Sequence, residues 1–165
     1  MSGTDIQQSE SRLELTRTIA ASPAQIFAVV SDPDGHVKID GSGMLVTAQD
    51  TSPMTGVGDS FVMNMDREAL GDIPLGKYQV RNTVTAFVPD ELFEWNVGGV
   101  DQPPFGHVYG YRLARHGEGA TAVTLYVDWS GVRAGSIRDR FPIVPAHMLE
   151  KSLDNLESLV TASPK

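Results

Sequence analysis

His36 and Asp40 are the two residues of this sequence whose types and spacing best suit acid–base chemistry. Residues four positions apart share one face of a helical turn, so the two side chains can meet if the segment is helical. A histidine held by a carboxylate can act as a general base, and an aldol cyclisation requires a proton to be taken from beside a carbonyl group. The structural alternative is that Asp40 binds the backbone of the turn at Gly41–Gly43, while His36 closes the short helix.

Three further polar side chains fall on predicted apolar strand faces. Arg17 could meet a ligand carboxylate or enolate, or it could lie at the sheet edge with its charge in water. Asn82 could hydrogen-bond a ligand or a neighbouring tyrosine. His107 could point into a pocket near its mouth, or it could lie exposed at the end of a strand.

Other chemistry-bearing motifs are missing from the sequence. The chain has no cysteine, which excludes thiolate nucleophiles and disulfides. The stretches Gly41–Gly43 and Gly56–Gly58 lack the forms that bind phosphate and are predicted as turns. No HExxH motif occurs, the four histidines have no ligand-like spacing, and no serine lies in a GxSxG motif. We therefore expect no metal site, no cofactor and no serine hydrolase.

Composition predicts one globular domain over residues 12–161. Of the 165 residues, 41% are hydrophobic and 21% are charged. A net charge of −8 and a pI near 4.8 argue against nucleic acid as a partner. No apolar run approaches the roughly 18 residues that a membrane span needs. Residues 1–11 are polar and are predicted as a disordered lead-in rather than a secretory signal, so we expect a cytoplasmic protein.

The last predicted element is an amphipathic helix over Pro145–Val160. Apolar residues recur there at spacings of three and four, which places them on one stripe of the helix. The stripe consists of Ala146, Leu149, Leu153, Leu156 and Val160. A single amphipathic helix needs an apolar surface to lie on, and the preceding strands are expected to supply it.

Period-two alternation predicts strands over most of the remaining chain. The predicted strands are 12–19, 44–49, 61–66, 77–88, 92–97, 107–114 and 123–129. Two short helices follow the first strand, one starting at Ser22-Pro23 and one spanning Asp34–Ile39. Hairpin-sized connections make the sheet antiparallel. The sequence thus predicts an α+β fold in which a curved seven-stranded sheet wraps around the C-terminal helix.

This order of elements resembles the helix-grip fold of the START-like, Bet v 1-like (SRPBCC) superfamily over residues 12–161. The segments that carry the resemblance are Ile19–Pro23 running into Phe27–Pro33, His36 with Ile39–Gly43, Glu94-Trp95, Tyr109 with Tyr111, Thr121 with Val123, and Asp128–Ser130. The most similar branch is the polyketide cyclase/dehydrase and lipid-transport group. The resemblance implies a hollow between sheet and helix that holds an apolar or aromatic small molecule, and it implies no particular reaction.

A hollow also follows from packing. A strongly curved sheet cannot fill the space along one straight helix, and empty volume costs about 24 cal/mol per Å3, so a ligand, water or flexible side chains usually occupy it. Methionines give an adaptable wall, and tyrosines and tryptophans give flat faces with polar tips. The residues expected around the hollow are Met63, Met65, Tyr78, Trp95, Tyr109, Tyr111, Trp129, Met148 and Ser152.

Three functions remain open from the sequence. The leading hypothesis is a protein that binds a small hydrophobic, polyketide-like, aromatic or lipidic ligand. The second is a cyclase or dehydratase acting on a carbonyl substrate, with His36 and Asp40 as catalytic residues. The third is a protein-interaction module without a ligand, which includes self-association into a homodimer.

Overall fold

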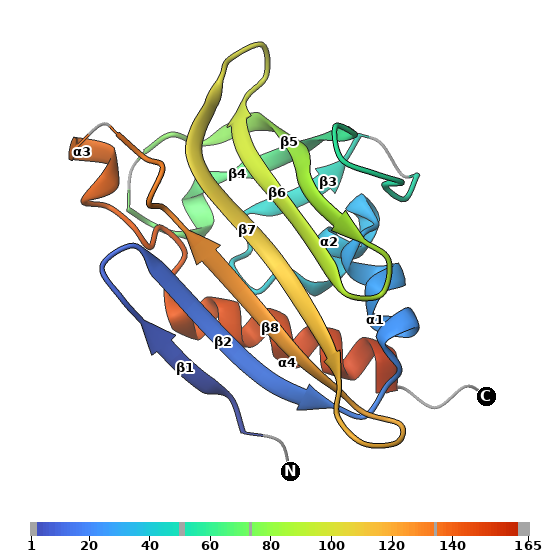
Figure 1. Ribbon diagram of the computed structural model, residues 1–165. Coiled ribbons are helices and arrows are strands. Elements are labelled where there is room, and N and C mark those ends of the chain that lie inside the picture. The colour runs from blue at the N-terminus through green and yellow to red at the C-terminus, as the bar shows by residue number, and fades with distance from the viewer. Residues whose placement is uncertain (1–2, 50–51, 73, 134, 162–165) are drawn as a thin grey trace.

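An eight-stranded antiparallel sheet curves around one long helix in the computed structural model, which describes residues 3–49, 52–72, 74–133 and 135–161 (Figure 1). The strands are β1 (Asp5–Gln8), β2 (Arg12–Ile19), β3 (Leu45–Ala48), β4 (Ser60–Asp66), β5 (Lys77–Val88), β6 (Leu92–Gly99), β7 (Pro104–Arg115) and β8 (Thr121–Asp128). Their order in the sheet is β1-β2-β8-β7-β6-β5-β4-β3. The predicted helix-grip architecture is therefore confirmed.

Within the described ranges, four α-helices and one short 3-10 turn accompany the sheet. They are α1 (Pro23–Val30), α2 (Pro33–Ile39), η1 (Arg67–Ala69), α3 (Gly135–Arg138) and α4 (Ala146–Thr161). Helix α1 begins with a capping box, in which the side chains of Ser22 and Gln25 satisfy each other's backbone N–H groups, and Pro23 occupies its first turn. Helix α2 has no such reciprocal pair, but its N-cap Asp32 accepts a hydrogen bond from the backbone N–H of Asp34.

Alternating burial follows the predicted strand faces. Along β2 the even-numbered residues are half-buried while the odd-numbered residues, which face α4, are fully buried. Strand β5 has the predicted bounds and keeps the same period until a bulge between Val84 and Ala86. The inner, concave face of the sheet is thus apolar, and its outer face carries most of the charges.

Helix α4 lies across the concave face (Figure 1). Its buried side chains are Leu149, Ser152, Leu153 and Leu156, and it packs mainly on β2, α2 and α1. Because α4 lies close to these elements, it stands away from the inner faces of β4 to β7. No helix among the described residues is long and apolar enough to cross a membrane.

Part of the N-terminal segment, which was predicted as a disordered lead-in, forms a strand. Residues Asp5–Gln8 form β1 and pair antiparallel with β2, so the sheet has eight strands instead of seven. All four side chains of β1 are exposed, and a strand exposed on both faces has no apolar alternation by which to recognise it. Residues 1 and 2 of the expected lead-in lie outside the described part of the chain.

The turn that follows α2 contacts α4 closely at Gly41. The backbone N–H of Gly41 donates to Ser152 Oγ at 2.9 Å. A Cβ atom at Gly41 would lie 2.3 Å from the carbonyl oxygen of Met148 and 2.6 Å from the backbone nitrogen of Ser152. Helix backbone cannot rotate away as a side chain can, so only glycine fits at this contact.

We expect Gly41→Ala to lower the free energy of unfolding by about 1–3 kcal/mol or more, because the added methyl group forces the turn away from α4. Gly56→Ala is the matched control, since a Cβ there meets no heavy atom within 4 Å. Urea unfolding of both variants measures the difference. Equal stability of the two variants would contradict the close contact.

Candidate functional site

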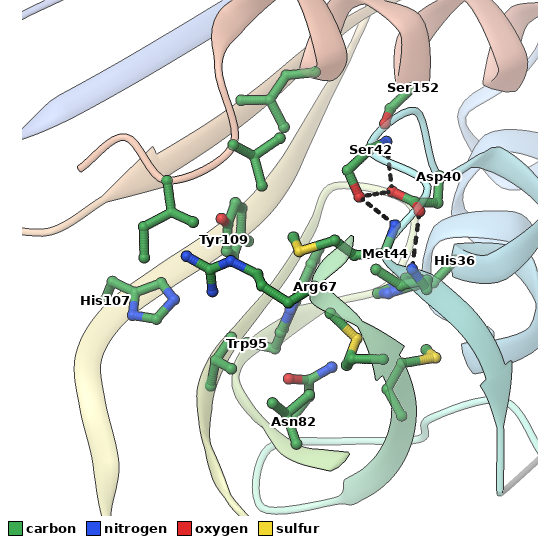
Figure 2. Close-up of a pocket in the computed structure, with 18 of the residues that line it drawn as sticks. His36, Asp40, Ser42, Met44, Arg67, Asn82, Trp95, His107, Tyr109 and Ser152 are labelled. Carbon is green, nitrogen blue, oxygen red and sulfur yellow. Dashed lines mark hydrogen bonds between the residues drawn. The ribbon is translucent and has the colours of Figure 1, made fainter. Parts of the chain in front are cut away.

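A cavity of about 300 Å3 lies between the concave face of the sheet and the helices α2 and α4 (Figure 2). Its walls come from the inner faces of β4 to β8, the turn after α2, and the segment that precedes α4. Leu75 and Phe105 belong to the lining and are also 50% and 48% exposed, so they mark the mouth of the cavity. The cavity is thus open to solvent at one side.

Methionines and aromatic rings make up much of the cavity wall. Met44, Met63 and Met65 line it and are at least nine-tenths buried. Trp95 stacks on Tyr109 and Tyr111, with ring centroids 5.9 and 6.1 Å apart. Unbranched thioethers adapt to irregular shapes and contact aromatic rings favourably, so this wall suits a flat, apolar molecule.

The predicted pair of His36 and Asp40 is not assembled as a general base. Nε2 of His36 donates to the carbonyl oxygen of Val30 at 2.6 Å. The Asp40 carboxylate instead accepts the backbone N–H of Ser42 at 2.9 Å, the Ser42 hydroxyl at 2.7 Å and the backbone N–H of Leu45 at 3.1 Å (Figure 2). Asp40 therefore has the structural role, in which its carboxylate binds the turn after α2. Both His36 and Asp40 nevertheless line the cavity.

His36 is an uncharged ring in an apolar environment. Burial lowers its pKa to about 4, and the hydrogen bond to Val30 and the nearby carboxylates oppose this only in part. The rings of Phe61, Phe93 and Trp95 surround it, with centroids 5.4, 5.8 and 4.6 Å away. Such a histidine acts chiefly as part of the wall.

The Asp40 turn is fixed to α4 by two side chains of the helix. Besides the bond from Gly41 to Ser152, the amide of Asn155 donates to the carbonyl oxygen of Ile39 at 3.1 Å. Ser152, which was predicted beside the hollow, lines the cavity and also holds this turn. These contacts hold the turn after α2 against α4.

Two buried polar side chains of the cavity wall lack hydrogen-bond partners among the described residues. They are Asn82, through Oδ1, and His107, through Nδ1, and each residue is 5% exposed. Burial lowers the pKa of His107 to about 4, so its ring is neutral at pH 7. A buried polar atom without a partner costs about 1–3 kcal/mol, and a ligand can recover this energy.

Arg67, which sequence reasoning missed, brings a positive charge to the cavity. It follows the last residue of β4, is 9% exposed, and reaches into the hollow (Figure 2). Asp72 binds it through two parallel bonds, to Nε at 2.8 Å and to Nη2 at 2.7 Å. The hydrogen bonds to Asp72 raise the Arg67 pKa, with Tyr78 contributing, so the guanidinium stays charged. Arg67 follows Met63 and Met65 at every second residue, and this period-two continuation of the inward face of β4 is the signal that could have revealed it.

Three predicted ligand contacts lie outside the cavity lining. Arg17 is buried between β2 and α4, where its Nη1 lies 2.6 Å from Asp154 and 3.2 Å from Glu157, and its Nη2 donates to Thr4 at 2.6 Å. These partners hold it away from any ligand, which corrects its predicted role. Met148 packs against the core.

Trp129 is the third of these residues. Its indole N–H donates to the carbonyl oxygen of Glu10 at 3.0 Å, and its ring stacks on Phe141 at 5.8 Å. It therefore belongs to the core, next to the cavity rather than in its wall. The remaining predicted contacts line one cavity together, namely His36, Asp40, Met63, Met65, Tyr78, Asn82, Trp95, His107, Tyr109, Tyr111 and Ser152.

Metal binding is not indicated within the described ranges. No group of three or more histidine, aspartate or glutamate side chains gathers there in a way that could hold an ion. The carboxylates nearest the cavity, Asp40 and Asp72, are each already engaged by hydrogen bonds.

A curved antiparallel sheet that grips a long C-terminal helix defines a protein of the helix-grip class. Residues 10–161 match the family described as polyketide cyclase / dehydrase and lipid transport, and the chain belongs to this family. An uncharacterized protein of Mycobacterium tuberculosis, Rv0088, is 30% identical over 139 residues, which cover 84% of this chain and 56% of Rv0088. The chain thus spans about half the length of the curated relatives it matches.

Solved structures with the same fold include both enzymes and proteins without a stated activity. Ms6760 from Mycobacterium smegmatis has a TM-score of 0.70 at 19% identity, covering 98% of this chain and 99% of its own. The Zhui aromatase/cyclase from a Streptomyces species has a TM-score of 0.63 at 13% identity, covering 94% of each chain. Norcoclaurine synthase from Thalictrum flavum has a TM-score of 0.60 at 16% identity, covering 99% of this chain and 97% of its own. At these identities the similarity establishes the fold alone.

We expect acidification to destabilise the protein between about pH 6.5 and pH 4. The folded-state pKa of His36 and of His107 is about 4, below the ordinary 6.5, so the unfolded state binds more protons in this window. Each histidine should remove about 2 kcal/mol of the free energy of unfolding by about pH 5. Urea unfolding at about pH 7 and pH 5 measures the loss.

Substitution separates the two histidines from other titrating groups. His107→Gln should roughly halve the loss of unfolding free energy on acidification, because only one of the two histidines with a lowered pKa remains. His147→Gln changes an exposed residue, so this variant should lose as much unfolding free energy on acidification as the unmodified protein does. A pH dependence that is the same in all three proteins would show that His107 does not titrate as its burial requires.

Proposed function

We propose that this protein binds a small apolar or aromatic molecule in the cavity between the sheet and α4. The observation that carries the proposal is a pair of polar atoms, Asn82 Oδ1 and His107 Nδ1, which have no hydrogen-bond partner among the described residues and lie in a wall that is otherwise largely apolar. A core built only for stability would bury hydrocarbon at these positions. The family to which the chain belongs includes proteins of lipid transport and polyketide chemistry, and this agrees with the proposal.

The size and flexibility of the cavity indicate the kind of ligand. A volume of about 300 Å3 is at the lower end of the range for small-molecule sites, which suits a molecule of about two or three rings or a short acyl chain. The stacked rings of Trp95, Tyr109 and Tyr111 favour a flat ligand. Met44, Met63 and Met65 can adjust to its outline.

The two tryptophans of the chain allow a direct test, because Trp95 lines the cavity and Trp129 does not. We expect 2-acetonaphthone to shift the indole N–H resonance of Trp95 in an NMR titration. The Trp129 resonance should move little, since its N–H is bound to Glu10. Trp95→Phe and Trp129→Phe assign the two signals. A shift of Trp129 alone, or of neither, would argue against binding in this cavity.

Filling the cavity should weaken binding. Val97 lies in the wall of the cavity, and Val108, on the next strand, is half-buried but lies outside the lining. Val97→Trp should weaken the binding of 2-acetonaphthone at least about tenfold, which corresponds to about 1.4 kcal/mol, because the indole takes up the ligand volume. Val108→Trp is the control and should leave the affinity unchanged, as measured by calorimetry. Equal affinities of the two variants would place the ligand outside this cavity and contradict the proposal.

Catalysis on a carbonyl substrate is the second candidate function. Arg67 could polarise a carbonyl and stabilise an enolate, and the neutral ring of His107 could accept the proton taken from the adjacent carbon. The protonated His107 could then return this proton to the β-hydroxyl group, which leaves as water while the enolate collapses to the conjugated ketone. This candidate replaces the pair of His36 and Asp40, whose side chains are used elsewhere.

Dehydration of 4-hydroxy-4-phenylbutan-2-one to its conjugated ketone tests this candidate by ultraviolet absorption. A catalyst should raise the rate above that in buffer, and His107→Gln should lower it by about 10²-fold or more, as for a lost general base. His116→Gln, on an exposed turn, is the control. A rate equal to that in buffer, together with retained binding of 2-acetonaphthone, would leave binding as the function.

A further inference from the structure

Asn82 occupies a position at which its neighbours are apolar. It lies on the inner face of β5 between Val80 and Val84, and it pairs with Phe61 on β4 and with Val97 on β6. Side chains on one face of a sheet contact such neighbours first. None of these four can accept or donate a side-chain hydrogen bond, which explains why Asn82 Oδ1 has no partner in the described part of the chain.

The unmet requirement of Asn82 defines a complementary ligand group. A carboxamide presents one acceptor oxygen and two donor hydrogens. A hydroxyl group can donate to the oxygen and also accept from the amide nitrogen, so it satisfies Asn82 in either orientation of the amide. A hydrocarbon at the same place would leave the amide buried and unpaired, at a cost of about 1–3 kcal/mol.

The charges at the cavity oppose an anionic ligand. Among the described lining residues, the charged side chains are Arg67 and Asp40. Asp72 binds the Nε and Nη2 edge of the Arg67 guanidinium, so the pair of Arg67 and Asp72 carries no net charge. A ligand carboxylate would add a further negative charge beside Asp40 and Asp72 in a poorly solvated space. The guanidinium can still donate to the oxygen of a neutral carbonyl group, since planar arginine has five N–H donors.

On the basis of the proposed binding function, we propose that the cavity selects neutral hydroxy-carbonyl compounds with an apolar ring body. Asn82 receives the hydroxyl group, Arg67 donates to the carbonyl oxygen, and the ring lies on Trp95 between them. Asn82 is thus the residue that determines specificity, and the pair of Arg67 and Asp72 determines the charge of the ligand. Figure 2 shows Asn82, Arg67 and Trp95 around the same hollow.

Three naphthalene probes test this proposal by calorimetry at pH 7. They are 6-hydroxy-2-acetonaphthone, which has both groups, 2-acetonaphthone, which lacks the hydroxyl, and 6-hydroxy-2-naphthoate, which carries a carboxylate in place of the ketone. The first should bind at least about tenfold more tightly than either of the others, as expected for one buried hydrogen bond or one uncompensated charge. Equal binding of the two ketones, or tighter binding of the carboxylate, would overturn the proposal.

Asn82→Leu isolates the hydroxyl preference, because leucine has a similar volume and no hydrogen-bonding group. The variant should bind the two ketones with affinities within about twofold of each other, through loss of affinity for the hydroxylated one. Asn96→Leu is the matched control, since its Oδ1 is also buried and unpartnered but lies outside the cavity lining. That variant should keep the preference. A preference that survives in Asn82→Leu would refute the role of Asn82.

The outcomes separate this proposal from the binding function on which it rests. If none of the three probes binds, both fail together. If 2-acetonaphthone binds and shifts Trp95 but the hydroxylated ketone binds no better, the binding function stands and the selectivity fails. The comparison of probes with the unmodified protein does not depend on whether the variants fold.

Discussion

The close contact between the turn at Gly41 and helix α4 is the constraint on which the cavity depends. The Asp40 carboxylate organises this turn through Ser42 and Leu45, and Ser152 and Asn155 hold it against the helix. With α2 and the turn in place, α4 rests on β2, α1 and α2 and cannot descend onto β5, β6 and β7. The space left above these strands is the cavity. By organising this turn, Asp40 thus helps to keep the cavity open.

The polar residues of the cavity wall are unfavourable for folding. Asn82 and His107 are buried without partners among the described residues, and Arg67 needs Asp72 to be buried at all. Apolar side chains at these positions would give a more stable protein with a drier core. This cost supports the proposed recognition of a ligand, in which stability is given up for selectivity.

Strand faces, helix positions and the fold class could be predicted from the sequence, because period-two and period-3.6 patterns reflect which side of an element is buried. The strand β1 could not, since it is exposed on both faces. Arg17 was assigned wrongly because the carboxylates that bind it, on α4, are more than a hundred residues away in the sequence. Spacing placed His36 and Asp40 on one face but could not reveal the backbone groups that each one binds. Arg67 was missed because a charged residue just past the end of β4 was not read as the next member of the inward face formed by Met63 and Met65.

The two half-exposed side chains at the cavity mouth bear on how quickly a bound molecule could leave. Leu75 precedes β5 and Phe105 lies at the start of β7, so neither belongs to the paired centre of the sheet. Rotation of such side chains takes picoseconds to nanoseconds, whereas displacing α4 would require breaking its contacts with β2 and α2. Exchange through this mouth leaves the fold intact, and the lifetime of a complex is then set by the contacts inside. Under the proposed binding function, a ligand can therefore be released without any opening of the sheet or helix.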